Sequence, residues 1–248
     1  MRILEAHNGL SALLVDQSIY DGLWVSSLTH AASKGLPDTE LVPLKERVDL
    51  VEEFSRITDK PIIVDIDNGG PIEHLPFLMR WFEKAGAYAV IMEDKKGAKK
   101  NSLLEENPQQ LEDVDVFREK IKTAKDNVGN MKVFARLESL IAKKSKYEAL
   151  LRAEAYIEAG ADGVMVHSKV KVDATEVMEV GNELRQRYPQ LILIAVPTTY
   201  LLPEVHPFDI VIEANQMLRA SLKAMQKYLA GDQVELASVE EIFFIIGK

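Results

Sequence analysis

The sequence of 248 residues lacks cysteine, an excess of basic residues and any long apolar run. Without thiols the chain has no disulfides, no cysteine-ligated zinc, no iron–sulfur cluster and no thiolate nucleophile. Asp and Glu (39) outnumber Lys and Arg (30), and the formal charge of −9 argues against binding to nucleic acids or anionic membranes. The apolar runs are far shorter than the roughly 20 residues that a membrane-spanning helix needs.

What remains is the composition of a globular protein, with 47 % hydrophobic and 28 % charged residues. The first residues lack the basic region and apolar stretch of a signal peptide, so we expect a cytoplasmic protein. A chain of this length buries roughly three quarters of its unfolded surface and needs no disulfide for stability. Because no linker or low-complexity tract interrupts the sequence, we predict a single domain over residues 1–248.

Short apolar runs that end in turn or polar residues predict eight β-strands. They lie at residues 3–5, 22–26, 61–67, 87–92, 132–138, 163–166, 191–196 and 209–212. Apolar residues at helical spacing predict helices at residues 44–57, 75–85, 114–124, 146–159, 174–188 and 217–229. Strands alternating with helices over about 250 residues predict an α/β fold, a (β/α)8 TIM barrel. The alternative is a doubly wound open sheet, whose dinucleotide-binding form is weakened because no Gly-x-Gly-x-x-Gly follows a strand.

Polar side chains follow the apolar runs at the carboxyl ends of these strands. The residues concerned are Ser26, Asp65, Asp67, Glu93, Arg136, Glu138 and His167. Each one alone is also explained as a helix cap or a buried polar group. In a barrel, however, the carboxyl ends of all strands meet at one face, where active sites are built. The common position of these residues therefore predicts an active site.

Asp65, Asp67 and Glu93 are the expected metal ligands. Three carboxylates in a small volume repel one another unless a cation lies among them. Because the ligands are all oxygens, we expect Mg²⁺, with Mn²⁺ as a substitute. Magnesium keeps several waters, so one carboxylate would bind it directly and the others through water. Arg136 and a nearby lysine would complete an anion site for a small substrate with carboxylate and phosphoryl groups.

Two polar segments, which we expect to be flexible, flank this predicted site. Residues 94–102 are rich in lysine, and they form either a solvated surface loop or a mobile lid, around 94–106. As a lid, the segment would bring Lys99 and Asn101 over a phosphoryl group. Residues 26–39 follow the second strand, and their small polar residues would offer backbone N–H groups to a carboxylate, with Asp38 facing the metal.

These motifs, in this order, resemble phosphoenolpyruvate mutases of the isocitrate lyase and phosphoenolpyruvate mutase superfamily. Asp65-Ile-Asp67-Asn-Gly69 is similar to the family's Asp-x-Asp-Thr-Gly metal motif, and residues 93–103 are similar to its lid. Further similar blocks lie at residues 5–11, 24–28, 34–38, 135–138, 167–169, 196–198 and 214–220. Three positions depart from the pattern: Ile66 replaces a small residue, Asn68 replaces Thr, and Gln216 replaces His.

The resemblance implies an isomerase that interconverts phosphoenolpyruvate and phosphonopyruvate, the carbon–phosphorus bond formation of phosphonate biosynthesis. It implies that Asp65 holds Mg²⁺ and that Asp67 and Glu93 act mainly through metal-bound waters. The other implied roles are substrate carboxylate binding by Ser26, Ser27 and Leu28, packing of Trp24 on the three-carbon unit, phosphoryl contacts from Arg136, His167, Lys99 and Asn101, and a place for Asp38 beside the migrating group. It also implies a homodimer or homotetramer in which the last helix, residues 239–246, is exchanged between subunits.

Three alternatives differ from this interpretation at named residues. A phosphonopyruvate hydrolase shares most of the site but typically has Thr where this chain has Asn101. A carbon–carbon lyase of the superfamily carries a cysteine acid/base in the lid, and this sequence has no cysteine. A catalytically silent barrel would be expected to lose a metal ligand or Arg136, and neither is lost.

Overall fold

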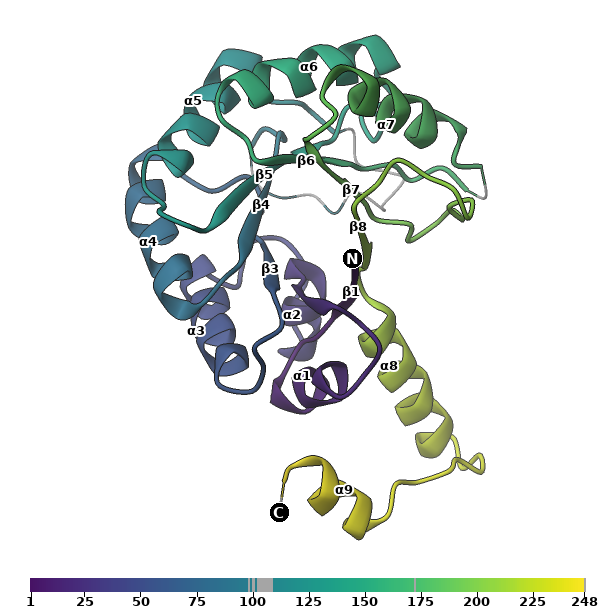
Figure 1. Ribbon diagram of the computed structural model, residues 1–248. Coiled ribbons are helices and arrows are strands. Elements are labelled where there is room, and N and C mark those ends of the chain that lie inside the picture. Colours follow the sequence, from purple (N-terminus) through teal and green to yellow (C-terminus); the bar gives the residue numbers. More distant parts are fainter. Residues whose placement is uncertain (98, 100, 102–108, 172, 248) are drawn as a thin grey trace.

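The computed structural model describes residues 1–97, 99, 101, 109–171 and 173–247. Its eight parallel strands close into a barrel in chain order, with the last strand paired to the first (Figure 1). The strands are β1 (Arg2–Glu5), β2 (Gly22–Val25), β3 (Ile62–Asp65), β4 (Ala89–Glu93), β5 (Lys132–Leu137), β6 (Gly163–Val166), β7 (Ile192–Ala195) and β8 (Ile210–Glu213). The predicted (β/α)8 barrel is therefore confirmed, and the open sheet is excluded.

Helices surround the barrel and account for all six helical segments that the sequence predicts (Figure 1). They are α1 (Gly9–Asp16), α2 (Ser27–Ser33), α3 (Leu44–Ser55), the 3₁₀ turn η1 (Ile72–His74), α4 (Leu75–Ala85), α5 (Val114–Lys125), α6 (Lys146–Glu158), α7 (Thr175–Arg187), α8 (Gln216–Leu229) and α9 (Val239–Ile245). None of the helices in the described part of the chain is long and apolar enough to cross a membrane.

The helices α1 and α2 are among the elements that the periodicity of the sequence did not predict; the others are η1 and α9, of which α9 was expected only from the resemblance. Residues 26–39, expected to be a flexible polar segment, begin instead with α2, whose N-cap Ser26 accepts a hydrogen bond from the Thr29 amide. In α1, Asn8 and Ser11 form a reciprocal capping box. Both helices are short and have a small polar N-cap residue. The capping residues therefore indicate these helices in the sequence better than the spacing of their apolar residues does.

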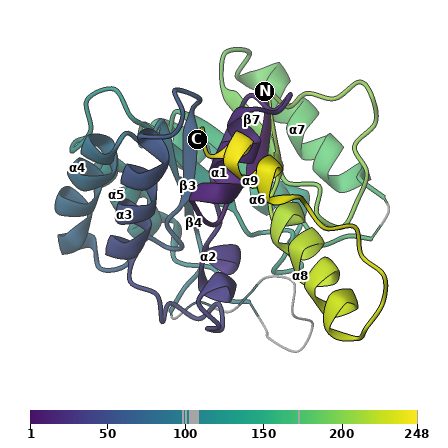
Figure 2. The same ribbon diagram turned by 90° about the horizontal axis from the view of Figure 1, so that it is seen from below.

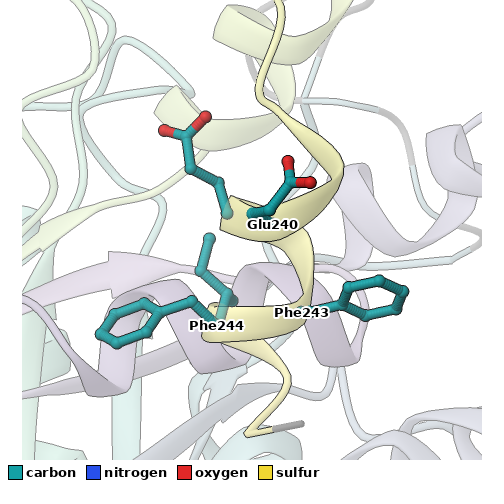
Figure 3. A pocket seen from close by; sticks show the side chains of 5 residues that line it. Glu240, Phe243 and Phe244 are labelled. Atoms are coloured by element: carbon teal, nitrogen blue, oxygen red, sulfur yellow. The ribbon is translucent and has the colours of Figure 1, made fainter.

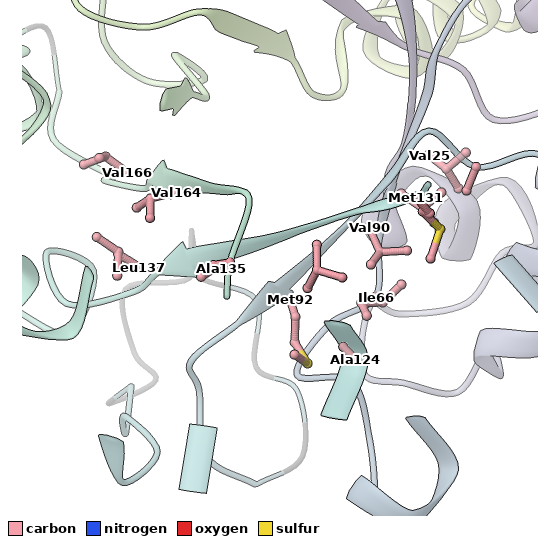
Figure 4. Packing of buried hydrophobic residues seen from close by; sticks show 14 of the residues in the cluster. Val25, Ile66, Val90, Met92, Ala124, Met131, Ala135, Leu137, Val164 and Val166 are labelled. Atoms are coloured by element: carbon pink, nitrogen blue, oxygen red, sulfur yellow. The ribbon is translucent and has the colours of Figure 1, made fainter. Parts of the chain in front are cut away.

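Alternation along the strands decides which side chains enter the barrel. In β4, Ala89 and Ile91 belong to the cluster inside the barrel, whereas Val90 and Met92 pack outward against the helices (Figure 4). A strand has a period of two residues, so Glu93 falls on the inner face at the carboxyl end. The same rule, continued from Phe134 inside β5, places Arg136 on the inner face. The apolar pattern thus aims these polar side chains at the mouth of the barrel.

The two C-terminal helices depart from the barrel wall. Helix α8 points away from the strands, and α9 lies beyond α1 at the end of an extended connection (Figures 1 and 2). No residue of α8 or α9, both fully described, is buried. This end of the chain therefore carries apolar side chains without a cover in the single subunit.

Candidate active site

A small cavity lies at the carboxyl ends of the strands, the face that the sequence predicts for the site. It is lined by Trp24, Ser26, Ser27, Leu28, Asp38, Asp65, Lys99, Asn101, Arg136, His167, Val196, Thr198, Ala214 and Asn215. The predicted site residues are therefore together, except that Asp67 and Glu93 lie buried outside the lining. The cavity volume of about 60 Å³ leaves room for about two water molecules, because side chains fill its centre.

The Lys99 side chain lines this cavity and faces three carboxylates. Its Nζ lies 3.1 Å from Asp38 Oδ1 and 3.9 Å from Asp65 Oδ2, and it also contacts Asp67 and the Ser27 hydroxyl. Burial works against the charged lysine, but the surrounding carboxylates outweigh it and raise the pKa of Lys99. Lys99 therefore stays protonated here and neutralises part of the acidic cluster.

Asp65 closes β3 and is surrounded by three cations. Burial opposes its ionisation, but the Lys99, Arg136 and Arg47 cations together lower the pKa of Asp65 below its usual range. Its oxygens accept hydrogen bonds from the Asp67 amide and the Ser27 hydroxyl, both at 2.9 Å. Asp65 is therefore ionised at neutral pH and fixed in position at the end of β3.

Arg47 is a site residue that the sequence analysis missed. It is buried on α3, with Nη2 2.6 Å from Asp67 Oδ2 and Nη1 donating at 2.8 Å to the main-chain oxygen of Asp65. It stands in a charged run that normally marks a solvated helix face. Its spacing to Val51 and Phe54 nevertheless places it on the apolar face of that helix, and this is the signal that could have identified it.

A second group of charges surrounds Arg136. The Arg136 guanidinium donates from Nε to Glu138 Oε1 at 2.5 Å, and Nη2 lies 2.9 Å from His167 Nδ1. The same Glu138 oxygen lies 2.7 Å from His167 Nδ1. Burial and the Arg136 charge lower the pKa of His167, so its imidazole is neutral at pH 7. Arg136 thus provides a fixed cation beside a neutral imidazole at the cavity wall.

Glu93 is the carboxylate with the least compensated burial. Burial raises its pKa to about 7, although Arg136 and Lys95 act in the opposite direction. Lys95 Nζ lies 3.1 Å from one Glu93 oxygen, whereas the buried Oε2 lies 3.5 Å from Arg136 Nη2 and accepts no hydrogen bond from any described residue. A buried carboxylate oxygen without a donor fits an additional positive group or a water bound to one.

The donor set is compatible with Mg²⁺ held partly by water and substrate. Within the described residues no three acidic or histidine side chains are close enough together to enclose a metal ion. Magnesium, however, is usually bound by one or two carboxylates and completes its shell with water and substrate oxygens. Asp65, Asp67 and the unbonded Glu93 oxygen offer oxygen ligands of that kind.

The predicted lid is described only in part, because residues 98, 100 and 102–106 lie outside the described residues. Asn101 is described, and its Nδ2 donates to Asp38 Oδ2 at 2.9 Å. Asp38 therefore receives Lys99 on one oxygen and Asn101 on the other. Both residues expected from the lid thus meet Asp38 inside the cavity.

Asp94 anchors the two strand ends that carry Glu93 and Arg136, although no role was predicted for it from the sequence. Its Oδ1 accepts from the Glu138 amide at 2.8 Å, and its Oδ2 accepts from Tyr156 at 2.9 Å and Arg152 at 3.2 Å. Burial raises the pKa of Asp94 to about 6. This buried network explains why β4 and β5 hold their terminal side chains in register.

Comparison with known proteins places this geometry in a family. The sequence profile of the phosphoenolpyruvate phosphomutase family matches residues 1–231. The phosphoenolpyruvate phosphomutase of Tetrahymena pyriformis is 35 % identical over 99 % of this chain and 86 % of that protein.

Two solved structures share the fold over the whole chain. Phosphoenolpyruvate phosphomutase from Streptomyces platensis subsp. rosaceus has a TM-score of 0.89 at 32 % identity, covering 100 % of this chain and 90 % of that one. Phosphonopyruvate hydrolase in complex with oxalate and Mg²⁺ has a TM-score of 0.85 at 29 % identity, with coverage of 100 % and 90 %. The chain belongs to the phosphoenolpyruvate phosphomutase family.

Proposed function

We propose that this chain is a Mg²⁺-dependent mutase that interconverts phosphoenolpyruvate and phosphonopyruvate by intramolecular phosphoryl transfer. The observation that carries the proposal is the meeting of Lys99 and Asn101 on Asp38, in one cavity with Arg136 and His167. Cations and an amide donor around a single carboxylate can bind a phosphoryl group while it moves between the oxygen and the carbon of the substrate. The 35 % identical Tetrahymena phosphomutase supports the same activity.

The metal would sit at the end of β3. Asp65 would bind Mg²⁺ directly, and Asp67 and Glu93 would hold its waters, as the oxygen donor set described above allows. When bound, the ion would neutralise the negative charge that develops on the enolate of pyruvate. The hydrolase structure that contains oxalate and Mg²⁺ supports this assignment.

The chain's own residues divide the substrate between two sides of the cavity. The first turn of α2, with Ser26, Ser27 and Leu28, faces the cavity and would orient the substrate carboxylate through N–H and hydroxyl donors. Trp24 lines the cavity floor and would pack against the planar three-carbon unit.

The phosphoryl group would lie on the other side, against Arg136 and His167. Lys99 would turn from the carboxylates to this group, because its side chain lines the same small cavity of about 60 Å³. Asp38 would stand beside the group in transit, and Asn101 would keep water away from it. Exclusion of water is what separates rebinding to carbon or oxygen from hydrolysis.

The direct test follows phosphonopyruvate with Mg²⁺ by phosphorus NMR. We expect its signal to be replaced by that of phosphoenolpyruvate, because the equilibrium favours the oxygen ester. Appearance of inorganic phosphate with pyruvate would instead identify a hydrolase, the second candidate, whose structure shares this fold. Lack of either product, with a folded protein and added Mg²⁺, contradicts both activities.

We also propose that the chain works as a homodimer or homotetramer in which its C-terminal helices pack on a neighbouring subunit. Leu222, Met225 and Tyr228 on α8 are at least half exposed. On α9, Phe243 and Phe244 project from different sides of the helix, so both sides lack a cover (Figure 3). Several exposed apolar side chains on neighbouring helices normally mark a surface that is buried in an interface.

Charge placed on α8 is expected to separate the subunits. Leu222→Glu combined with Met225→Glu should shift the sedimentation coefficient to that of a monomer, because two carboxylates would have to be buried at the interface. Lys223→Glu, on the same helix but already charged, is the matched control and should leave the assembly intact. A wild-type protein that sediments as a monomer at micromolar concentration contradicts the proposed assembly.

A further inference from the structure

Asn68 links the predicted metal-binding turn to the segment that carries Lys99. It follows Asp67 directly, and its Oδ1 accepts a hydrogen bond from the Gly70 amide at 2.9 Å. This bond fixes the orientation of the side-chain amide, so that Nδ2 faces Gly97 and donates to its carbonyl oxygen at 3.0 Å. The main-chain oxygen of Asn68 accepts a further bond from Lys120 Nζ at 2.9 Å. Both the side chain and the main-chain carbonyl of Asn68 are therefore held by hydrogen bonds.

Gly97 is the last described residue before Lys99. The residues just before it pair with a later segment: Lys95 forms an antiparallel bridge with Leu111, and the Lys96 amide donates to Gln110 O at 2.9 Å. Gly97 comes directly after this paired stretch and has a φ of 77°, a conformation that favours glycine. A Cβ there would meet no described atom within 4 Å, so the backbone conformation rather than space requires glycine. Gly97 lies two residues before Lys99, so a bond that holds its carbonyl acts close to Lys99 along the chain.

We propose that Asn68 is a positioning residue, which places Lys99 and Asn101 on Asp38 by holding the Gly97 carbonyl. Its catalytic consequence rests on the function proposed above. The side-chain amide offers an acceptor and a donor on two different atoms: Oδ1 accepts from the Gly70 amide, and Nδ2 donates to the Gly97 carbonyl. A threonine hydroxyl, the group typical at this position of the motif, is a single atom one bond closer to the main chain. It can serve Gly70 but does not reach Gly97 as well.

Proteolysis tests the positioning without any need for activity. We expect trypsin to cleave the native protein after Lys96 about two- to tenfold faster in Asn68→Thr and Asn68→Ala, the factor that corresponds to loss of one hydrogen bond. The fragment ending at Lys96 is followed by mass spectrometry. Asn127→Ala is the matched control, since its amide donates to Thr123 O at 2.9 Å on α5, far along the chain. It should leave the cleavage rate unchanged.

Turnover supplies the second readout. In Asn68→Thr we expect a lower kcat and a larger fraction of phosphonopyruvate lost as phosphate and pyruvate, with an unchanged melting temperature. In that side reaction water attacks phosphorus, the carbon–phosphorus bond breaks, and the pyruvate enolate takes up a proton. An unaltered cleavage rate in a folded Asn68→Thr protein overturns the positioning role, whatever the activity. A different outcome is faster cleavage of the Asn68 variants together with a wild-type protein that turns over no phosphonopyruvate. That result would overturn the proposed function and leave the positioning role of Asn68 intact.

Discussion

Replacement of Asp38 by alanine is expected to lower the conversion of phosphonopyruvate about a thousandfold or more, the loss that follows when one member of a catalytic group acting as a unit is removed. Asp38 is the residue on which both Lys99 and Asn101 converge, at 3.1 Å and 2.9 Å. Without its carboxylate, the two contacts that bring both donors to this point of the cavity are lost. Initial rates by phosphorus NMR measure the effect.

Two further variants, Asp38→Asn and Asp65→Asn, show whether the loss in Asp38→Ala comes from the carboxylate charge or from weaker metal binding. Asp38→Asn keeps the shape and one acceptor oxygen but removes the charge, so its residual rate separates positioning from electrostatics. Mn²⁺ titration followed by electron paramagnetic resonance should show nearly wild-type affinity in Asp38→Ala and a clear loss in Asp65→Asn. Full turnover by Asp38→Ala contradicts the proposed place of this residue in the site.

Substitution of Arg136 by methionine is expected to damage both activity and stability. The guanidinium is the shared partner of Glu138, Glu93 and Asp65, at 2.5, 3.5 and 3.8 Å. Removing one partner of a buried ion pair costs about 3–5 kcal/mol, because the other charge stays buried. At roughly 2–4 °C per kcal/mol for a chain of this size, the melting temperature should fall by about 10 °C.

Calorimetry with a conservative variant tests the explanation for Arg136. Arg136→Lys keeps the charge but loses the forked donors, so we expect it to recover most of the stability and little of the turnover. Lowering the pH should narrow the stability gap between Arg136→Met and wild type, because protonation of Glu93 removes a charge that lacks its partner. A methionine variant with wild-type melting temperature contradicts the shared-partner role.

The sequence was sufficient for the barrel because strand alternation and helix periodicity act over short distances. Inner positions such as Ile91 and Phe134 continue to Glu93 and Arg136, so the apolar pattern itself predicts where the polar ends lie. The predicted site residues come from strand ends, and the fold brings strand ends together. Short helices such as α2 escaped this reasoning because their polar first turn shows no apolar period.

Residues that reach the site across the fold could not be found in this way. Arg47 arrives from the inner face of α3, and its burial depends on how that helix packs. The bond from Asn68 to Gly97 joins positions 29 residues apart and requires the exact course of the chain between them. The carboxylates that Lys99 contacts in the structure depend on the arrangement of the whole site, so these partners could not be predicted from its position in the sequence.

The proposed packing of α8 and α9 on a neighbouring subunit would give the two ends of this chain different folding kinetics. The barrel buries its core within one copy, so its folding is a first-order process that ignores protein concentration. Ordering each residue costs about 1–2 kcal/mol of backbone entropy, and residues 216–247 bury too little of their own surface to offset it. If a neighbouring barrel covers them, as proposed, these residues would become ordered only by collision with a second copy. Their protection against hydrogen exchange should therefore rise with concentration, while that of the strands stays constant.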